Sequence, residues 1–354
     1  MAIGLDDVVA AETMLSDVDG ARGQLVIRGH RLDELAGRAS FEQVTALLFD
    51  GLIPLPAAMP AAMGAARGEV FACTRPLLPL LADLPVYDAM RAAVALLADG
   101  TETEDALMLV AAPGVLIPAL LRQAEGRDMI APDPTLGHAA DAVRMLGLGR
   151  DAARAAALDT YLVTVSDHGL NASTFAARVV ASTAAGLTSA VLAGLGALKG
   201  PLHGGAPGPV LDMLDAIAAA GDARAWLSRA VARGERLMGF GHRIYRVRDP
   251  RADALKAAVA LLPQTAGRLA EAQAVEAVAL DVLRAHRPGR VLETNVEFYT
   301  ALLLEAVGFP REAFTGVFAM GRVAGWVAHA REQALTGRLI RPQSRYVAHP
   351  PVAA

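Results

Sequence analysis

Two short segments of the 354-residue chain each place a histidine between glycines. The first, 199–205, surrounds His203, and the second, 239–251, begins around His242. Glycines let the backbone bend sharply and let a substrate approach the main chain, and histidine exchanges protons readily near neutral pH. We therefore expect both histidines in a site that polarises an anionic carbonyl compound. For His203, hydrogen bonding to nearby backbone is the alternative.

The second segment also carries a run of arginines, a residue type that suits carboxylates and phosphates. They are Arg243, Arg246, Arg248 and Arg251. Asp249 followed by Pro250 predicts the start of a helix, which places Arg251 in its first turn. A cation there opposes the helix dipole, and such a conflict with local preference often marks a functional residue. A solvated arginine cluster is the alternative.

Arg322 lies on a predicted helix over 314–335, between Phe318 and Trp326 at four-residue spacing. Residues at that spacing share one helix face. A charge on an otherwise apolar face needs an anionic partner. That partner is either a bound ligand or, as the alternative, a carboxylate in an internal salt bridge.

Glu297 is the most ambiguous residue. The sequence from Thr294 to Glu297, just before an apolar run, fits a capping box, so Glu297 could simply close a helix end. His168 sits beside a glycine ahead of a helix, and Arg341 follows the helix stop at Gly337. The histidines and Glu297 lack the close ligand spacing of a metal site, so we expect no metal.

Segments with a 3.6-residue period dominate, which predicts a mainly α-helical fold. The exception is a predicted N-terminal hairpin, with strands at 13–15 and 24–28 around Asp19-Gly20. Ser40 and Gln43 form a capping box for one helix. The expected helices are 41–49, 87–97, 106–121 with an interruption at Pro113-Gly114, one capped by Asn171 or Ser173 and running to 184, 211–219, 223–238, 252–262, 271–285 and 298–307.

Composition excludes several classes of protein. The chain is 54% hydrophobic and 20% charged, as compact proteins are, and its net charge of −4 argues against nucleic acid as a partner. Cys73 is its single cysteine, which excludes an intrachain disulfide. The N-terminus lacks a signal-peptide pattern. The charge-poor segment 181–198 is rich in small residues, so we expect a buried helix and not a membrane span. We expect a cytoplasmic protein.

Taken together, the motifs resemble those of citrate synthases over nearly the whole chain. The likeness lies in their identity and order: the N-terminal 4–13 signature, Asp19-Gly20, Arg28-Gly29, Ser166-Asp-His168, Gly200-Pro-Leu-His203-Gly-Gly205, Gly239-Phe-Gly-His242-Arg243, Asp249-Pro-Arg251, Asn295-Val-Glu-Phe298 and Arg341-Pro342.

The resemblance implies a homodimer of two-domain helical subunits, with a large domain (1–208 and 311–354) and a small one (209–310) that closes over substrate. It implies condensation of acetyl-CoA, a co-substrate, with oxaloacetate and water to give citrate and CoA, as in the tricarboxylic acid cycle, without a further cofactor. By motif, His203 would stabilise the enol and His242 would polarise the keto group. Glu297 would be the base.

The substrate-binding residues implied by the resemblance are His168, Arg251, Arg322 and, from the partner subunit, Arg341, all for oxaloacetate. Those implied for CoA are Leu237, Met238, Gly239, Phe240, Gly241 and Arg246. The sequence departs from the family at Glu297, where aspartate is usual, and at 206–208, where Ala-Pro-Gly replaces the commoner Ala-Asn-Glu. Two alternatives follow: a synthase for propionyl-CoA (2-methylcitrate synthase) or another 2-oxo acid, and a catalytically weakened acyl-CoA or dicarboxylate binder.

Overall fold

The computed structural model describes residues 8–204, 207–286, 288–289 and 291–346. Within these ranges the chain is mainly helical and has one small antiparallel sheet in the order β1-β2-β3. The prediction of a mainly α fold with an N-terminal hairpin is therefore confirmed. The strands are β1 (Ser16–Asp19), β2 (Gln24–Ile27) and β3 (His30–Arg31).

The helices of the first part of the chain are α1 (Leu32–Leu35), α2 (Phe41–Phe49), α3 (Met59–Thr74), the 3₁₀ helix η1 (Leu78–Leu81), α4 (Val86–Val94), α5 (Thr103–Ala124), α6 (His138–Val143), the π-helical turn η2 (Arg144–Leu148), α7 (Ala152–Val165), α8 (Ala172–Ala181) and α9 (Leu187–Leu198). Those of the second part are α10 (Pro207–Ala220), α11 (Ala223–Ala232), α12 (Pro250–Ala260), η3 (Pro263–Thr265), α13 (Ala266–His286), α14 (Val296–Val307), η4 (Arg311–Ala313) and α15 (Phe314–Thr336).

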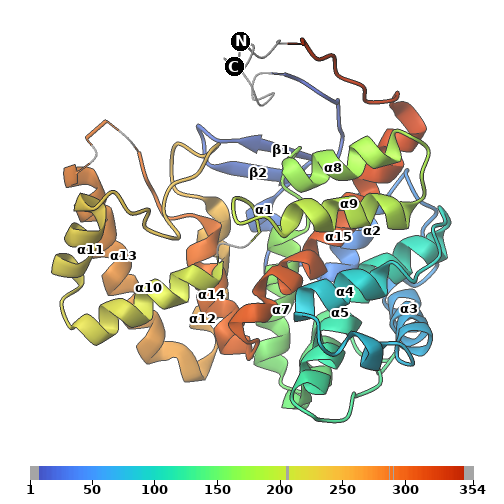
Figure 1. The fold of residues 1–354 in the computed structure, drawn as a ribbon, viewed down its shortest axis with the longest axis horizontal. Coiled ribbons are helices and arrows are strands. Elements are labelled where there is room, and N and C mark those ends of the chain that lie inside the picture. Colours follow the sequence, from blue (N-terminus) through green and yellow to red (C-terminus); the bar gives the residue numbers. More distant parts are fainter. Residues whose placement is uncertain (1–7, 205–206, 287, 290, 347–354) are drawn as a thin grey trace, which may run out of the picture.

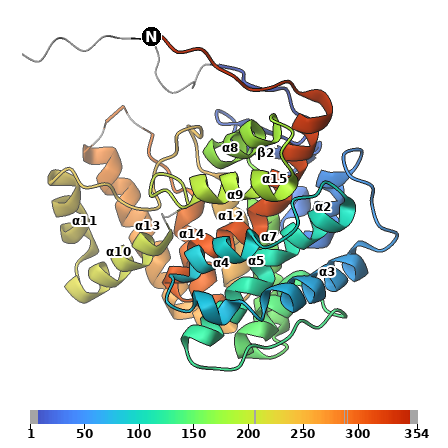
Figure 2. The same cartoon turned by 45° about the vertical axis from the view of Figure 1, so that its right-hand side comes forward.

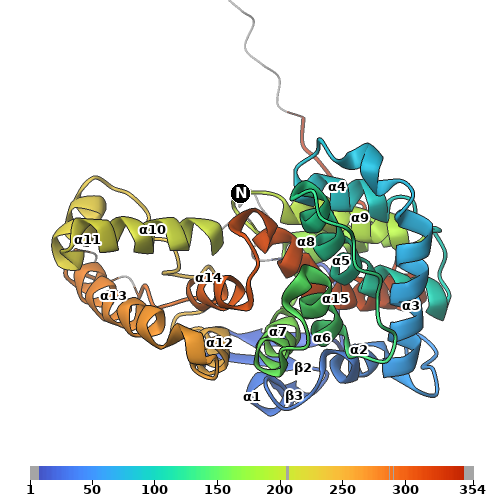
Figure 3. The same cartoon turned by 90° about the horizontal axis from the view of Figure 1, so that it is seen from below.

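The helices gather into a larger body and a smaller lobe. α5 and α15 run through the body, surrounded by α2, α3, α4, α7, α8 and α9 (Figure 1). α10, α11 and α13 lie at the opposite side, and α12 and α14 lie between them and the body (Figure 3). The described tail after α15 leads away from the body (Figure 2). Residues from the body and from the α12–α14 region can therefore meet where the two groups of helices join.

Local start signals are correct where the cap is decided by neighbours in sequence. Ser40 and Gln43 form the predicted capping box of α2. The Asn171 side chain accepts hydrogen bonds from the first turn of α8, which settles the choice between Asn171 and Ser173. Asp249 caps α12 with Pro250 at its first position. These side chains satisfy backbone N–H groups that have no partner inside the helix.

Three predicted boundaries are wrong, two because tertiary packing overrides local signals and one because Gly234 is a local stop signal that ends the helix early. α5 continues through Pro113, and Gly114 leaves room for the His138 ring, which a Cβ atom would overlap. The segment 181–198 is not one helix, because the chain breaks between α8 and α9 and Ala184 has a positive φ of 63°. α11 ends at Ala232, well before the predicted 238, and the chain turns at Gly234 with φ 79°.

Among the described residues, one helix, α5, is long and apolar enough to cross a membrane. Its apolar window is 83% buried inside the protein. Helices at the centre of a large core share this composition, because they contact apolar neighbours on every side. The apolar character of α5 is thus accounted for by its place between α3, α4 and α15.

Candidate active site

The predicted loop around His242 lies beside the segment that leads into α14. Gly241 N donates to Glu293 O at 2.7 Å, Asn295 N donates to Gly239 O at 2.9 Å, and the Asn295 side chain donates to Gly241 O at 2.8 Å. Gly239 and Gly241 both have φ above +80°, a conformation that favours glycine. This short backbone ladder places the His242 loop beside the start of α14, which carries Glu297.

His242 presents an uncharged hydrogen-bond donor to the site. Its Nδ1 accepts hydrogen bonds from the backbone N–H groups of Ile244 and Tyr245, at 3.0 and 3.1 Å. Burial, reinforced by the charge of Arg251, lowers the pKa of His242 to about 4, so the ring is neutral at pH 7. A neutral imidazole that accepts at Nδ1 carries its proton at Nε2. This is the tautomer needed to polarise a carbonyl oxygen and later protonate it.

Arg251 faces that same donor. Its Nη2 lies 3.3 Å from His242 Nε2, and since both groups carry hydrogen, neither can accept from the other. Asp249 holds the guanidinium through bonds of 2.8 and 3.0 Å and also accepts from Val296 N at 3.1 Å. Two converging donors require an acceptor oxygen between or beside them. The solvated-cluster alternative is therefore wrong for Arg251, which is 3% exposed.

His168 and Tyr245 complete this side of the site. His168 Nε2 lies 3.1 Å from Tyr245 Oη, and the His168 and His242 rings are 5.7 Å apart between centroids. Burial and the charges of Arg251 and Arg322 hold the pKa of His168 well below its usual value. Sequence reasoning missed Tyr245. The signal it offered was a single aromatic residue within the arginine run.

Arg322 is a buried cation whose charge is only partly compensated, by the nearby carboxylate of Asp167. It is 1% exposed, its Nε donates to Val165 O at 2.5 Å, and its Nη2 has no hydrogen-bond partner among the described residues. No carboxylate of the described residues forms an ion pair with it, so the internal-salt-bridge alternative is wrong there. Burial lowers its pKa to about 10. A bound carboxylate would supply the missing acceptor and charge.

Glu297 is not the capping residue that the sequence allowed. The N-cap of α14 is Asn295, whose side chain accepts from Glu297 N at 3.0 Å, while the Thr294 hydroxyl donates to Glu276 instead. Glu297 Oε2 is buried and has no hydrogen-bond partner among the residues described. Burial raises the pKa of this carboxyl against the opposing charges of Arg236 and Arg251. An underbonded carboxylate with a raised pKa is a competent proton acceptor.

His203 is held by a side chain, and no backbone bond to its ring is found among the described residues. Its Nε2 lies 2.7 Å from Ser173 Oγ, which also accepts from Trp326 Nε1 and lies 2.7 Å from Asn171 Oδ1. Burial and Arg322 lower the pKa of His203 to about 4. The Ser173 hydroxyl has one hydrogen, which it donates to Asn171 Oδ1, so that His203 Nε2 donates to Ser173 Oγ in this arrangement. Turning the hydroxyl toward Nε2 would place the imidazole proton on Nδ1. The sequence indicated Ser173 only as a possible helix cap.

A hollow of about 440 Å³ opens beside His242. Of the residues predicted to bind CoA, Leu237, Phe240 and Gly241 line it, and Met238 and Gly239 belong to the same loop. Arg246 is exposed and does not line the hollow, whereas Arg236 and Arg243 do. The cations at this hollow therefore differ from the one that the sequence pointed to.

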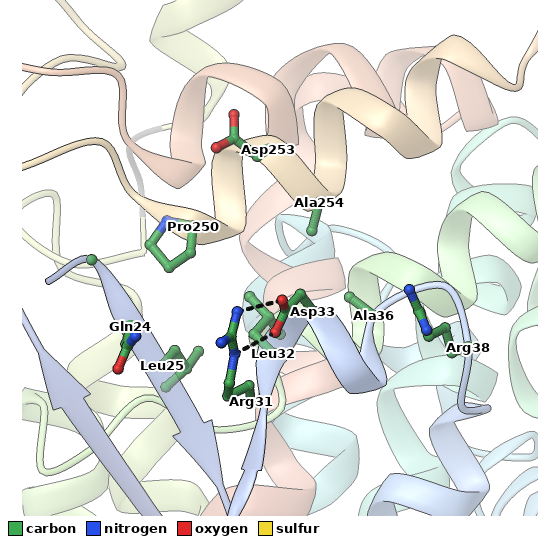
Figure 4. A pocket seen from close by; sticks show the side chains of 11 residues that line it. Gln24, Leu25, Arg31, Leu32, Asp33, Ala36, Arg38, Pro250, Asp253 and Ala254 are labelled. Carbon is green, nitrogen blue, oxygen red and sulfur yellow. Dashed lines mark hydrogen bonds and ion pairs between the residues drawn. The ribbon is translucent and has the colours of Figure 1, made fainter.

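Two further features lie apart from the cluster. Arg341 is exposed in the tail after α15 and makes no contact with the cluster in this single chain. A second hollow, of about 340 Å³, lies between β2, α1 and α12 (Figure 4). Arg31 and Arg38 both line it, Arg31 is paired with Asp33, and none of the predicted site residues lines it.

Within the described part of the chain, no three histidine, cysteine, aspartate or glutamate side chains are grouped as metal ligands would be. The metal alternative thus lacks the clustering that it requires. What the structure brings together instead is two neutral imidazole donors, buried arginines and one carboxylate of raised pKa. His168, His203, His242, Arg251, Arg322 and Glu297 lie in or beside this cluster.

A helical fold with buried arginines, neutral imidazoles and a buried carboxylate of raised pKa defines a site suited to acid–base chemistry on an anionic compound. The family model for the citrate synthase C-terminal domain matches residues 4–343. The chain belongs to the citrate synthase family and is an acyltransferase of the citrate synthase type.

The similar proteins are all named as synthases of this family, but their names give different products. The chain is 41% identical to a putative citrate synthase 2 of Mycobacterium tuberculosis, over 97% of this chain and 92% of that protein. It is 36% identical to a 2-methylcitrate synthase of the same species, over 98% and 90%. A citrate synthase from Thermoplasma acidophilum, solved as a ternary complex with carboxymethyl coenzyme A and oxaloacetate, superposes with a TM-score of 0.86. It is 26% identical, and the match covers 99% of this chain.

Proposed function

We propose that the protein condenses acetyl-CoA with oxaloacetate and water to give citrate and free CoA. The observation that carries the proposal is the group of unmatched polar atoms in the cluster. Arg251 and His242 direct donors at each other, Arg322 Nη2 is orphaned, and Glu297 Oε2 has no partner. Buried polar atoms are normally paired. A keto dicarboxylate supplies acceptors for the first three, and a carbon acid supplies the proton for the fourth.

The first chemical step is proton transfer. Glu297 Oε2 takes a proton from the methyl group of acetyl-CoA, and the electron pair of that C–H bond forms the enol C=C bond. A hydrogen bond from His203 Nδ1 stabilises the charge that develops on the thioester oxygen. Because the pKa of His203 is about 4, it donates as a neutral group. The raised pKa of Glu297 brings it nearer to that of the acid it must deprotonate.

Carbon–carbon bond formation follows. The enol carbon attacks the keto carbon of oxaloacetate while His242 Nε2–H bonds the keto oxygen and transfers its proton to the alkoxide. His168, Arg251 and Arg322 hold the carboxylates, so that two charges are matched without water. Hydrolysis of citryl-CoA then adds water across the thioester and releases citrate and the CoA thiol.

We propose in addition that the α10–α13 lobe belongs to the small domain 209–310 and moves toward the body when substrates bind, excluding water. Arg341 would complete the carboxylate pocket from the second subunit of a homodimer, because the exposed tail carries it away from its own site. The cytoplasmic location, the absence of a cofactor and the absence of nucleic acid or membrane partners stay predictions.

The test is release of free thiol from acetyl-CoA or propionyl-CoA with a panel of 2-oxo acids. We expect oxaloacetate with acetyl-CoA to have the highest kcat/KM. A higher value with propionyl-CoA would establish the 2-methylcitrate synthase alternative, which is favoured by the similarity to such an enzyme. CoA binding without thiol release for any pair would refute both and leave the weakened binder, which Glu297 in place of aspartate motivates.

A further inference from the structure

A buried carboxylate outside the cluster holds four separate segments of the α12–α14 region together. Glu276, on α13, is 5% exposed. Its Oε1 accepts from Arg248 Nη1 at 2.7 Å and from Thr294 Oγ1 at 2.6 Å. Its Oε2 accepts from Tyr299 Oη at 2.5 Å, and Lys256 Nζ lies 3.7 Å away. Such convergence on one side chain needs an explanation beyond the burial of α13.

The residues that hydrogen-bond to Glu276 are close neighbours, in the chain, of the proposed catalytic residues. Arg248 lies in the loop between His242 and Arg251, and its Nε is anchored to Asp253 at 2.6 Å. Thr294 comes three residues before Glu297, and Tyr299 comes two residues after it. One carboxylate therefore bonds the loop that carries the acid and the helix start that carries the base.

The contacts also explain why the group at this position is charged. Burial alone would raise the pKa of Glu276, but the hydrogen bonds from Thr294, Tyr299 and Arg248 outweigh it and hold the pKa below its ordinary value. An ionised carboxylate accepts several hydrogen bonds at once, whereas an amide of the same shape must present two donors. A neutral substitute cannot satisfy all these partners together.

Glu276 also contacts the residue just before the cap of α14. Thr294 is the residue that would cap the helix in the capping box read from the sequence, with Glu297 reaching back to it. In the structure the Thr294 hydroxyl donates to Glu276, and the N-cap is Asn295. Glu297 Oε2 is without a hydrogen-bond partner among the residues described.

We propose that Glu276 is a positioning residue that sets the distance between the base Glu297 and the acid His242. The inference rests on the proposed function for the roles of these two residues. The direct backbone ladder between 239–241 and 293–295 keeps the loops adjacent, and Glu276 determines their register and the orientation of Glu297. Displacements near 1 Å at reacting groups cost about 100-fold in rate.

The test compares Glu276→Gln and Thr294→Val with wild type and with Asp141→Asn. Asp141 is a matched control because it is a fully buried carboxylate that bonds Arg67 and Arg144 within the larger body, away from the cluster. Two readouts are used on the full-length protein. One is the kcat and KM of thiol release, and the other is amide hydrogen exchange of peptides covering 240–250 and 291–300.

For Glu276→Gln we expect kcat to fall ~10- to 100-fold while KM for oxaloacetate changes less than ~3-fold, since His168 and Arg322 lie outside the two peptides that loosen. Exchange should rise in both peptides, and Thr294→Val should show the same pattern more weakly. Asp141→Asn should lower the free energy of unfolding but leave kcat and the exchange of the two peptides unchanged. A normal kcat of Glu276→Gln, with normal exchange in the peptides 240–250 and 291–300, would overturn the proposal. A loss of stability of this variant with an unchanged kcat per folded molecule would overturn it as well.

The exchange readout separates the two proposals. A wild-type protein that releases no thiol refutes the proposed function, yet coupled loosening of the two peptides in Glu276→Gln still supports the positioning role. An active wild type whose variant loosens one peptide alone refutes the positioning role and leaves the proposed function intact.

Discussion

Replacing Arg322 by methionine should raise the free energy of unfolding and lower the affinity of the site for oxaloacetate. In the folded protein, burial lowers the pKa of Arg322 to about 10. At 1.36 kcal/mol for each tenfold change in proton affinity, this lowering corresponds to about 3 kcal/mol by which folding disfavours the charged form. Because the folded pKa stays far above neutrality, this cost applies in full at pH 7. Methionine has a similar length and no charge.

Part of this gain is offset by what the substitution removes. The hydrogen bond from Nε to Val165 O contributes about 1–2 kcal/mol and leaves a carbonyl unpaired when lost. The stacking of the guanidinium on Phe318, 4.9 Å from the ring centroid, is lost as well. We therefore expect Arg322→Met to raise the free energy of unfolding by about 1–2 kcal/mol. Oxaloacetate affinity should fall at least ~30-fold, since a carboxylate loses its buried partner.

Urea denaturation without ligand and calorimetric titration of oxaloacetate measure the two effects. The matched control is Arg178→Met, because Arg178 is equally buried but paired with Glu332, Gln333 and His329. That control should lose about 3–5 kcal/mol, as expected when one partner of a buried ion pair is removed. If Arg322→Met behaved like Arg178→Met and bound oxaloacetate normally, the assignment of an only partly compensated, ligand-facing charge would be refuted.

Three further predictions concern the base, the core and the subunit interface. Glu297→Gln should lower kcat of thiol release ~10²- to 10⁴-fold with a urea midpoint no lower than that of wild type, and a clear loss of stability would instead support a structural role. Burial lowers the pKa of His138 from 6.5 to about 3. The stability that its neutral form contributes is therefore complete above pH 6.5 and declines as pH falls, by about 2 kcal/mol at pH 5. In urea titrations, the free energy of unfolding should differ less between pH 7 and pH 5 for His138→Leu than for wild type. Arg341→Ala and His242→Ala, each inactive alone, should regain up to about a quarter of wild-type activity after dissociation and mixing, and no recovery would place Arg341 outside the partner's site.

Local rules were sufficient wherever neighbours in sequence decide the outcome. The Ser40–Gln43 box, the Asn171 cap and the Asp249-Pro250 start all form as predicted, because each satisfies backbone groups within one helical turn. Local rules failed at Pro113, where a buried central helix continues through the proline, and between α8 and α9, where an apolar run breaks into two helices. Packing against other helices decides such cases.

For the site, sequence pattern correctly singled out the residues whose type conflicts with their place. Arg251 in a first helical turn and Arg322 on an apolar face both prove to be buried, and Arg322 Nη2 has no hydrogen-bond partner among the described residues. The pattern did not reveal Tyr245 or Arg236, and it indicated Ser173 only as a possible helix cap. Those residues matter through contacts with segments distant in the chain, and no spacing rule encodes such contacts.

The sequence by itself therefore determined the helical class, the caps of α2, α8 and α12, and the family to which the motifs belong. Tertiary structure alone decided the state of the functional groups: which nitrogen of His242 bears the proton, that no carboxylate of the described residues forms an ion pair with Arg322, and that Glu297 Oε2 has no hydrogen-bond partner among those residues. The reason is physical. Tautomer, burial and charge compensation depend on atoms brought together by folding, as when the Asp167 carboxylate comes to face Arg322 from 155 residues away in the chain.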